Sequence, residues 1–438
     1  MRILQLTPGT GTFLCGSCLR DNALVVKLRE RGHDALIAPL YLPFALEDEE
    51  PNEAAETSIH MGGINVYLQQ RLPLLRWLPR FLHDRLDSPR LLRWAAGHSK
   101  MTETPGLGAM TLSMLRGEEG RQRAELERLV GWVSEMPRPD VLILSNAMLI
   151  GLAHELKAAL GCPVLCTIQG EAPFLDGLDA KHRDLCWQTL AERAQEIDGF
   201  MPVSQYTADL MGERMRVGPE RMHVVWNGIE PEGIAPDPSQ RDPERPAVGF
   251  LARMCRDKGI DTLVDAFIRL KRDHPSARLV AAGVVLNEDR PLLAELQRRV
   301  DAAGFADDVE LLGPVSRDEK IRLLQRVDVF SVPATYGESF GLYLPEAWAA
   351  GLPVVQPRHG AFPELVEETG SGLLCAPNDP DALAAALGEL LGDPQRRETF
   401  GAAARAAALE RFTADRMTDE VEEALQRFIG TPVASPRS

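Results

Sequence analysis

The sequence has 438 residues, 45% of them hydrophobic and 26% charged, which is ordinary for a soluble globular protein. Its formal net charge of -16 argues against nucleic acid as the main partner, because phosphate backbones are bound by an excess of Lys and Arg. No apolar run is long enough to span a membrane or to act as a signal peptide, and the seven scattered cysteines fit a reducing compartment. We therefore expect a cytoplasmic protein.

Apolar runs typical of buried strands alternate with amphipathic stretches in the first half of the chain. Residues 3–6 predict a strand that leads into a glycine-rich turn, and a helix is expected from about 17 to 31. Gly32 ends this helix, and residues 35–39 predict the second strand. Three further apolar runs predict buried strands at 141–144, 164–167 and 222–226.

The second half repeats this alternation. Five apolar runs predict strands, at 247–251, 278–282, 309–312, 327–332 and 352–355, and helices are expected between them, as at 261–272 and 317–325. Such alternation predicts an α/β protein whose parallel sheets are covered by helices on both faces. Pro and Gly are dense between 231 and 246. We place an N-terminal Rossmann-like domain at 1–235, a linker at 236–246 and a C-terminal Rossmann-like domain at 247–411.

One segment differs from the rest of this acidic chain. Residues 71–100 contain six Arg and one Lys against two Asp, with aromatic residues and many leucines. One interpretation is a helical insert whose leucines pack on the N-terminal domain. The other is a contact surface for an anionic lipid or an anionic acceptor, which would allow peripheral contact with the inner face of a membrane.

The segment 335–351 carries the most informative chemistry. It follows the predicted strand 327–332, and ligands of open α/β sheets bind at the carboxyl ends of parallel strands. Gly341 allows the backbone to approach a ligand closely, and a helix is expected to start near Leu342. The free N–H groups of such a helix start suit a diphosphate. Glu338 and Glu346 then make sense as acceptors of hydrogen bonds from sugar hydroxyls on either side of it.

Two basic residues follow the predicted strand 247–251. Arg253 and Lys258 lie where they can neutralise a departing diphosphate, Arg with a bidentate fork and Lys with a point charge. They can replace the divalent cation that other enzymes use, and the chain has no Asp-x-Asp triplet, so no metal is expected. The alternative is a solvated helix start.

These residues together resemble the donor-site signature of family 4 glycosyltransferases. Arg253, Lys258 and Gly259 are followed by 337–342 and by Glu346, and the two Glu have the E-x7-E spacing of that family. Segments 226–230 and 363–377 resemble the flanking regions. The resemblance implies a GT-B fold, with two Rossmann-like domains facing each other across a cleft. It also implies that the C-terminal helix, at 412–430, crosses back to the first domain.

The family's site roles carry over to matching positions of this chain. Glu338 would contact the transferred sugar, Glu346 would hold the ribose, and Phe340, Gly341 and Leu342 would present backbone groups to the donor. Arg253 and Lys258 would stabilise the departing diphosphate. The resemblance implies a retaining hexosyltransferase without a cofactor, which moves sugar from a UDP- or GDP-sugar to a hydroxyl of a sugar, lipid or small molecule. Polysaccharide, glycolipid or envelope glycan synthesis is the expected setting.

The N-terminal candidates follow the first and fourth expected strands. Gly11 and Gly16 match best the family's glycine-rich loop near the donor phosphates. Cys15 and Cys18 form a C-x-x-C pair there, either small residues lining that loop or a redox or metal site. Where family members commonly have a His, this chain has Gln169 and Glu171, either of which replaces it in contacting the donor sugar.

Two other functions remain open at this stage. A dinucleotide-dependent oxidoreductase would suit two Rossmann-like domains, but the G-x-G-x-x-G fingerprint is missing. A catalytically idle nucleotide-sugar-binding protein would keep the same donor residues.

Overall fold

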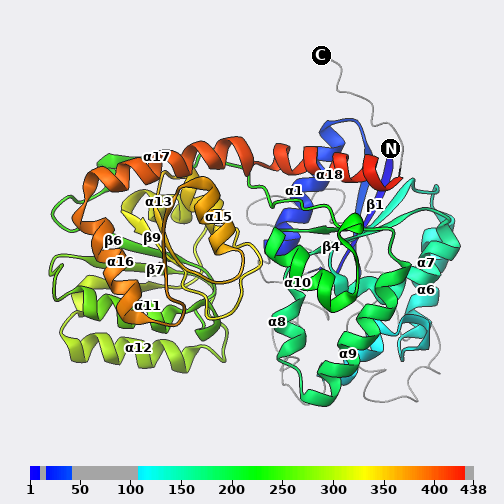
Figure 1. Cartoon of the computed structure of the whole chain (residues 1–438), viewed down its shortest axis with the longest axis horizontal. Coiled ribbons are helices and arrows are strands. Elements are labelled where there is room, and N and C mark those ends of the chain that lie inside the picture. The colour runs from blue at the N-terminus through cyan, green and yellow to red at the C-terminus, as the bar shows by residue number, and fades with distance from the viewer. Residues whose placement is uncertain (10–15, 42–106, 430–438) are drawn as a thin grey trace. The chain divides into compact units, whose positions relative to one another are not determined.

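A computed structural model describes residues 1–9, 16–41 and 107–429 and divides the chain into two compact units (Figure 1). Unit 1 comprises Met1–Trp226 and Met417–Ser438, and unit 2 comprises Asn227–Arg416. The expected linker at 236–246 lies within unit 2, because that unit already begins at Asn227.

Unit 1 is built on a five-stranded sheet in which every pair of neighbouring strands is parallel. The strands lie in the order β2-β1-β3-β4-β5, a doubly wound arrangement. Their bounds are β1 Arg2–Thr7, β2 Asp34–Pro39, β3 Val141–Leu144, β4 Val164–Ile168 and β5 Gly199–Pro202. The strand order reverses between β1 and β3, and ligands of such sheets bind at the carboxyl ends beside this switch point.

Helices cover both faces of this sheet. One face packs against α1 (Gly16–Glu30) and α18 (Ala414–Ile429) through a core that includes Leu24, Val421 and Leu425. The opposite face is covered by α5 Leu107–Leu115, α6 Arg123–Glu135, α7 Ala153–Leu160, α8 Glu171–Asp176, α9 Ala180–Arg193 and α10 Gln205–Met215. Because α18 belongs to unit 1 from Met417 onward, the prediction that the last helix returns to the first domain is confirmed.

Unit 2 contains a six-stranded parallel sheet in the order β11-β10-β9-β6-β7-β8. The strands are β6 Ala247–Leu251, β7 Arg278–Ala282, β8 Val309–Leu312, β9 Val329–Phe330, β10 Val354–Pro357 and β11 Gly372–Cys375. The chain runs outward from β6 to β8 and then returns to the other side of β6. The switch point of unit 2 therefore lies between β6 and β9.

The helices of unit 2 lie on both sides of its sheet, with α11 and α12 on one side and α13 and α17 on the other (Figure 1). The bounds are α11 Ile260–Leu270, α12 Arg290–Ala303, α13 Arg317–Arg326, α14 Tyr343–Ala349, α15 Phe362–Thr369, α16 Pro380–Gly392 and α17 Pro394–Arg411. The predicted α/β fold with two Rossmann-like units is confirmed.

One expected strand was wrong, and two strands were missed. Residues 222–226 form no strand but only an isolated bridge from Met222 to Phe200, whereas β5 and β11 were not expected. Both missed strands begin with Gly, a weak strand former. Tertiary packing explains these glycines: a Cβ on Gly199 would lie 2.5 Å from the ring of Phe428, and one on Gly372 would lie 1.9 Å from the carbonyl oxygen of Val354.

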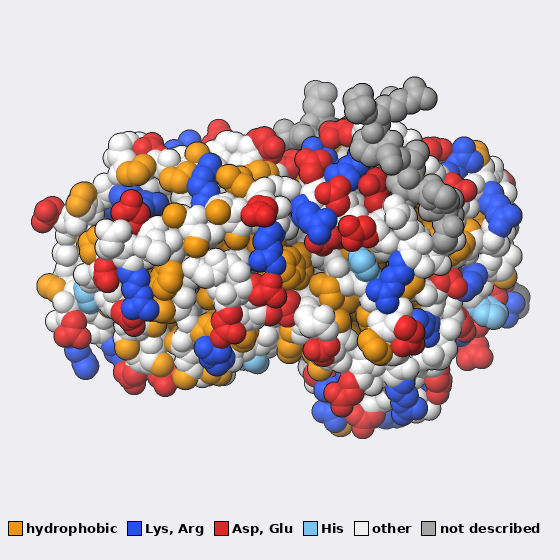
Figure 2. Space-filling model, turned by 45° about the horizontal axis from the view of Figure 1, so that its top comes forward, with side chains coloured by type: hydrophobic (Ala, Val, Ile, Leu, Met, Phe, Trp, Pro, Cys, Tyr) orange, Lys and Arg blue, Asp and Glu red, His pale blue; other side chains and the backbone are white. Residues whose placement is uncertain are grey.

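One face of the described surface is mixed in charge. On the face shown in Figure 2, acidic and basic side chains are interspersed over both units. Within the three described ranges, no helix is long and apolar enough to cross a membrane. The basic segment 71–100 lies outside the described residues, so both interpretations of it stay predictions.

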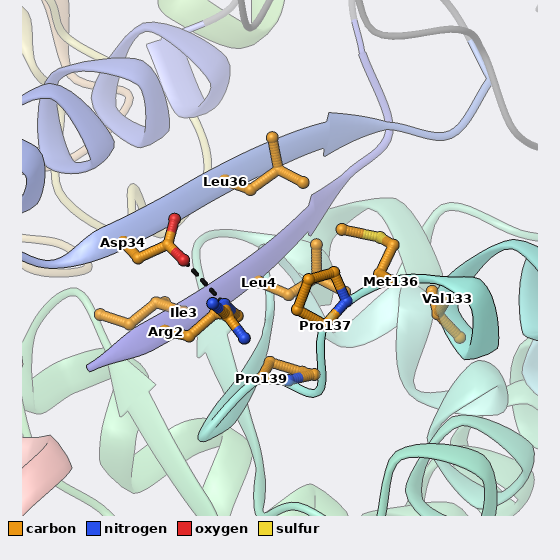
Figure 3. Close-up of a pocket in the computed structure, with 9 residues that line it drawn as sticks. All are labelled: Arg2, Ile3, Leu4, Asp34, Leu36, Val133, Met136, Pro137 and Pro139. Carbon is orange, nitrogen blue, oxygen red and sulfur yellow. Dashed lines mark hydrogen bonds and ion pairs between the residues drawn. The ribbon is translucent and has the colours of Figure 1, made fainter.

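A small pocket lies at the amino ends of β1 and β2, at the opposite edge of the sheet from the switch point (Figure 3). Its volume is about 160 Å³, and its lining is mainly apolar, with Leu4, Leu36 and Met136 among the residues. Arg2 and Asp34 form an ion pair of 2.7 Å at its rim. Since ligands of parallel sheets bind at the carboxyl edge, we expect the ligand site at that edge and not in this pocket.

Candidate active site

Two loops meet at the switch point of unit 2. One follows β6 and ends in a short 3-10 helix, Arg256–Lys258, and the other follows β9. The N–H of Thr335 donates to the carbonyl oxygen of Asp257 at 2.9 Å, which ties the loops together. Gly259 makes this approach possible: its φ is +72°, and a Cβ there would lie 1.9 Å from the carbonyl oxygen of Pro333.

Lys258 and Glu338 form an ion pair across these two loops. The Lys258 ammonium donates to Oε2 of Glu338 and, at 2.5 Å, to the hydroxyl of Tyr336. The side chains are 21% and 11% exposed. Burial alone would lower the pKa of Lys258, but the Glu338 carboxylate and the Tyr336 hydroxyl outweigh burial and raise that pKa. Lys258 therefore stays a cation at the switch point.

Two tyrosines that sequence reasoning missed complete this cluster. The Tyr343 hydroxyl donates to Oε2 of Glu338 at 3.0 Å, and the Tyr336 hydroxyl lies 3.2 Å from Oε2 and 3.3 Å from Oε1. Burial, and then the nearby carboxylate, raise the pKa of Tyr336 to about 12 and hold the pKa of Tyr343 well above its ordinary value. Both phenols are therefore neutral hydrogen-bond donors.

The second predicted carboxylate has a partner that the sequence did not reveal. Lys320 on α13 donates to Oε1 of Glu346 on α14 at 2.8 Å. The Lys320 side chain is 9% exposed. A lysine on the same helical face as buried Leu323 and Leu324 is the signal that could have indicated a paired role.

Arg253 is engaged elsewhere. Its guanidinium forms ion pairs with Glu288 at 2.5 Å and with Asp289 at 2.9 Å, both in the segment between β7 and α12. Among the described residues, no hydrogen bond joins Arg253 to Lys258 or Glu338. The structure therefore brings Lys258 and Glu338 together at the switch point and holds Arg253 toward the neighbouring loop.

The segment from Phe340 to Leu342 connects the two carboxylates. The Phe340 side chain is buried, with its ring centroid 6.0 Å from that of Phe412, so this ring is part of the core and not a ligand contact. Gly341 adopts a φ of +84°. In the part of the chain that the structure describes, the amides of Gly341 and Leu342 donate to no protein acceptor. Such amides suit an anionic ligand.

The loop after β10 packs against the backbone of Glu338. The Ala361 N–H donates to the carbonyl oxygen of Glu338 at 2.9 Å. A Cβ on Gly360 would lie 2.5 Å from the backbone nitrogen of Glu338, so the close contact requires glycine there. His359 directly precedes this contact, and its Nδ1 is buried without a hydrogen bond in the described structure.

In unit 1, Gln169 and Glu171 follow β4. The buried Glu171 carboxylate accepts N–H bonds from Ala147 at 2.8 Å, Gly170 at 2.8 Å and Gln169 at 3.0 Å. Burial raises the pKa of Glu171 even though these N–H bonds oppose the rise. Glu171 thus holds the loops after β3 and β4 together. Gln169 is half-buried, and its side-chain amide donates to the carbonyl oxygen of Ser145 at 3.0 Å.

The glycine-rich turn is only partly described. Gly11 and Cys15 lie outside the described residues, whereas Gly16 is the exposed first residue of α1. Cys18 is buried, with its Sγ 3.6 Å from the Thr7 hydroxyl. Across the described ranges, no group of three His, Cys, Asp or Glu side chains is arranged to hold a metal ion.

Family models match both units. The model described as "Glycosyl transferases group 1" matches residues 234–407, and the model "Glycosyltransferase Family 4" matches residues 108–232. The chain belongs to the family 4 glycosyltransferases.

The fold agrees, since two solved structures superpose on nearly the whole chain. Anabaena HepE in complex with UDP has a TM-score of 0.68, with 18% identity, and covers 97% of this chain and 100% of its own. A sucrose-phosphate synthase of Thermosynechococcus elongatus has a TM-score of 0.71, with 16% identity, and covers 98% and 99%.

Curated relatives are similar over part of their length. An exopolysaccharide phosphotransferase of Streptomyces coelicolor is 30% identical over 66% of this chain and 29% of its own. A GDP-mannose-dependent phosphatidylinositol monomannoside mannosyltransferase of Mycolicibacterium smegmatis is 33% identical over 48% of this chain and 57% of its own. The chain thus spans about half, or less, of the length of these relatives.

Proposed function

We propose that this family 4 glycosyltransferase is a retaining, metal-independent hexosyltransferase that uses a UDP- or GDP-sugar. The observation that carries the proposal is the pairing of Lys258 with Glu338 at the switch point of unit 2, beside the amides of Gly341 and Leu342, which donate to no acceptor within the described ranges. A cation, a sugar-binding carboxylate and free N–H groups at one sheet edge are what a sugar diphosphate requires.

The donor is proposed to lie along the loop after β9 and the start of α14. Glu338 accepts hydrogen bonds from the transferred hexose, and Glu346 accepts them from the ribose. The amides of Gly341 and Leu342, with Lys258, contact the diphosphate. Two related proteins support the choice of base, because one is named as GDP-mannose-dependent and another was solved with UDP-glucose.

The proposed reaction is a displacement at the anomeric carbon. The acceptor hydroxyl forms a bond to this carbon on the face that the diphosphate leaves, so the configuration is retained. The bond between the carbon and the β-phosphate oxygen breaks, its electron pair goes to the phosphate, and the acceptor proton passes to the same phosphate. Lys258 stabilises the negative charge that develops on the phosphate. Arg253 contributes to this stabilisation after its guanidinium has separated from Glu288 and Asp289.

The acceptor is proposed to be a hydroxyl of a saccharide, a lipid or a small molecule in polysaccharide, glycolipid or envelope glycan synthesis. The basic composition of 71–100 supports an anionic acceptor or peripheral contact with a membrane from the cytoplasmic side. In unit 1, Gly16 and Gln169 remain candidates for donor contacts.

The test is a calorimetric and thermal-shift panel of UDP-, GDP- and ADP-sugars, with NAD and NADP alongside and without added metal. Glu346→Ala is compared with Glu398→Ala, an exposed position on α17. We expect one class of nucleotide-sugar to bind to the wild type and to the Glu398 variant but only weakly to the Glu346 variant. Binding of NAD or NADP, with no nucleotide-sugar bound, would refute the proposal and favour an oxidoreductase.

Turnover separates the enzyme from an idle binder. We expect release of UDP or GDP from the bound nucleotide-sugar in the presence of saccharide or lipid acceptors, with the product sugar in the donor's anomeric configuration by NMR. Tight binding without release under any acceptor would support the idle nucleotide-sugar binder instead.

A further inference from the structure

We propose that Tyr343 and Tyr336 are positioning residues, which hold the Glu338 carboxylate in place when Lys258 turns to the donor diphosphate. This inference rests on the proposed function, in which Glu338 contacts the transferred sugar. It concerns two side chains that neither the family signature nor the sequence pattern had indicated.

The hydrogen bonds on Glu338 are unevenly distributed. Oε2 accepts from Lys258, from Tyr343 at 3.0 Å and from Tyr336 at 3.2 Å. Among the described residues, Oε1 has only the contact of 3.3 Å to Tyr336, whose single hydroxyl proton is shared with Oε2. Because each carboxylate oxygen can accept about two hydrogen bonds, Oε1 keeps the capacity for a sugar hydroxyl. The three protein donors thus fix one oxygen and leave the other for the ligand.

Lys258 has two competing demands. In the structure it neutralises Glu338, whereas the proposed reaction requires its charge at the diphosphate. An ammonium on a flexible four-carbon chain can swing between the two. Within the described ranges, Lys258 is the one charged donor to Glu338, and a largely buried carboxylate that lost it would be costly unless other donors remained. The hydroxyls of Tyr343 and Tyr336 are those remaining donors, and both stay protonated because their pKa values are raised.

The geometry of the tyrosines suits this role. Lys258 Nζ lies 5.1 Å from the ring centroid of Tyr336 and 5.7 Å from that of Tyr343, so the rings flank the ammonium and can stabilise it as it moves. The Tyr343 ring is buried, 6.2 Å from the ring of Phe330. A Cβ on Gly341 would lie 2.8 Å from this ring, so the loop fits around the ring closely.

The proposal predicts a selective loss. Tyr343→Phe keeps the ring but removes the donor to Glu338, so it should weaken only interactions that involve the sugar. We expect kcat/KM for the nucleotide-sugar to fall about 10- to 100-fold, because a hydrogen bond to a charged group is lost at the reacting sugar. The Kd of UDP or GDP, which carry no sugar, should stay within about twofold.

The experiment uses the full chain with UDP-glucose, GDP-mannose, UDP and GDP as probes. It compares wild type, Tyr343→Phe, Tyr336→Phe, Glu338→Gln and the double variant Tyr343→Phe/Glu338→Gln. Thr369→Val is the matched control, because it also removes a buried hydroxyl from unit 2, one that donates to the Leu365 carbonyl at 2.7 Å. Calorimetry gives Kd, steady-state kinetics gives kcat and KM, and thermal unfolding shows that each variant is folded.

We expect Tyr343→Phe to lower kcat/KM strongly in the wild type but to lower it little further in the Glu338→Gln variant. The control Thr369→Val should leave kcat/KM unchanged. Three outcomes would overturn the positioning role. The first is an unchanged kcat/KM in Tyr343→Phe, and the second is a loss of affinity for UDP or GDP as large as the loss in kcat/KM. The third is a double variant in which the losses in kcat/KM of the two single variants add in full. Should Tyr343→Phe not fold, the half-buried Tyr336→Phe decides by the same criteria. A wild type that neither binds nor turns over any nucleotide-sugar overturns the proposed function as well, which separates the two failures.

Discussion

Lys320 on α13 and Glu346 on α14 form an ion pair of 2.8 Å whose side chains are only 9% and 19% exposed. Such a pair gains little in net stability but is costly to break, because the remaining charge is left without a partner. It fixes the carboxylate proposed to hold the ribose. If Glu346 binds the ribose as proposed, the pair links the packing of two helices to that site.

Lys320→Met tests this link. We expect the free energy of unfolding to fall by about 1–3 kcal/mol and the Kd for UDP or GDP to rise about tenfold, since Glu346 loses its orienting donor. Chemical denaturation and calorimetry measure the two effects. The double variant Lys320→Met/Glu346→Gln should regain stability but not affinity. Unchanged affinity in Lys320→Met would show that the pair only stabilises the fold.

Glu288→Gln tests whether Arg253 is held back from the diphosphate. Glu288 is 56% exposed, so its ion pair with Arg253 is weak and easily screened. Removing this competitor should lower the Kd of UDP or GDP about two- to fivefold at low salt, and the gain should shrink at high salt. Glu398→Gln on α17 serves as the control for a lost surface charge. Weaker diphosphate binding in Glu288→Gln would contradict this account.

Gly259→Ala tests the contact between the two loops at the switch point. Its Cβ would overlap the Pro333 carbonyl oxygen, at 1.9 Å, and its φ of +72° is unfavourable for Ala. We expect a loss of about 3 kcal/mol or more in the free energy of unfolding, together with loss of nucleotide binding. Gly304→Ala is the matched control: φ there is +79°, with nothing within 4 Å, so only about 1 kcal/mol should be lost. Equal effects of the two substitutions would argue against a close loop contact.

Glu171→Gln tests a structural role in unit 1. The wild-type carboxylate accepts three backbone N–H groups, and a Gln amide would direct its own N–H₂ at some of them. We expect stability to fall by about 1–3 kcal/mol, while kcat/KM changes little. Urea unfolding and steady-state kinetics measure the two quantities. A large fall in kcat/KM with unchanged stability would restore the interpretation of Glu171 as a sugar contact.

The same residue has a pH signature. Its folded-state pKa is raised above the ordinary value, so the folded protein binds more protons than the unfolded chain between the two pKa values. This contribution to stability is present at low pH and is lost as pH rises through the folded-state pKa. Unfolding measured from about pH 4 to about pH 8 should therefore show a decline in the wild type that Glu171→Gln lacks. Identical pH profiles would contradict the raised pKa.

The sequence by itself determined the elements whose signals are local. The predicted strands agree with the structure in both bounds at 141–144, 247–251, 278–282 and 309–312. A short apolar run between amphipathic stretches can be recognised from the adjacent sequence alone. The α/β class followed from the same alternation, and the family from residues 253–259 and 337–346, each of which is a short continuous segment of the sequence. Strands that begin with glycine, such as β5, were not predicted, because glycine is there for close packing against residues far away in the sequence.

Only the tertiary structure decided which partners these residues have. Lys258 and Glu338 are 80 positions apart, and their pairing depends on the strand order that places β9 beside β6. Lys320 and Glu346 are 26 apart, and their pairing depends on how α13 packs against α14 on either side of β9 in the sequence. The tyrosine donors to Glu338, the ion pairs of Arg253 and the inward-facing carboxylate of Glu171 arise in the same way. A side chain's partner is set by where the sheet brings other segments, and that placement leaves no periodic pattern in the chain around it.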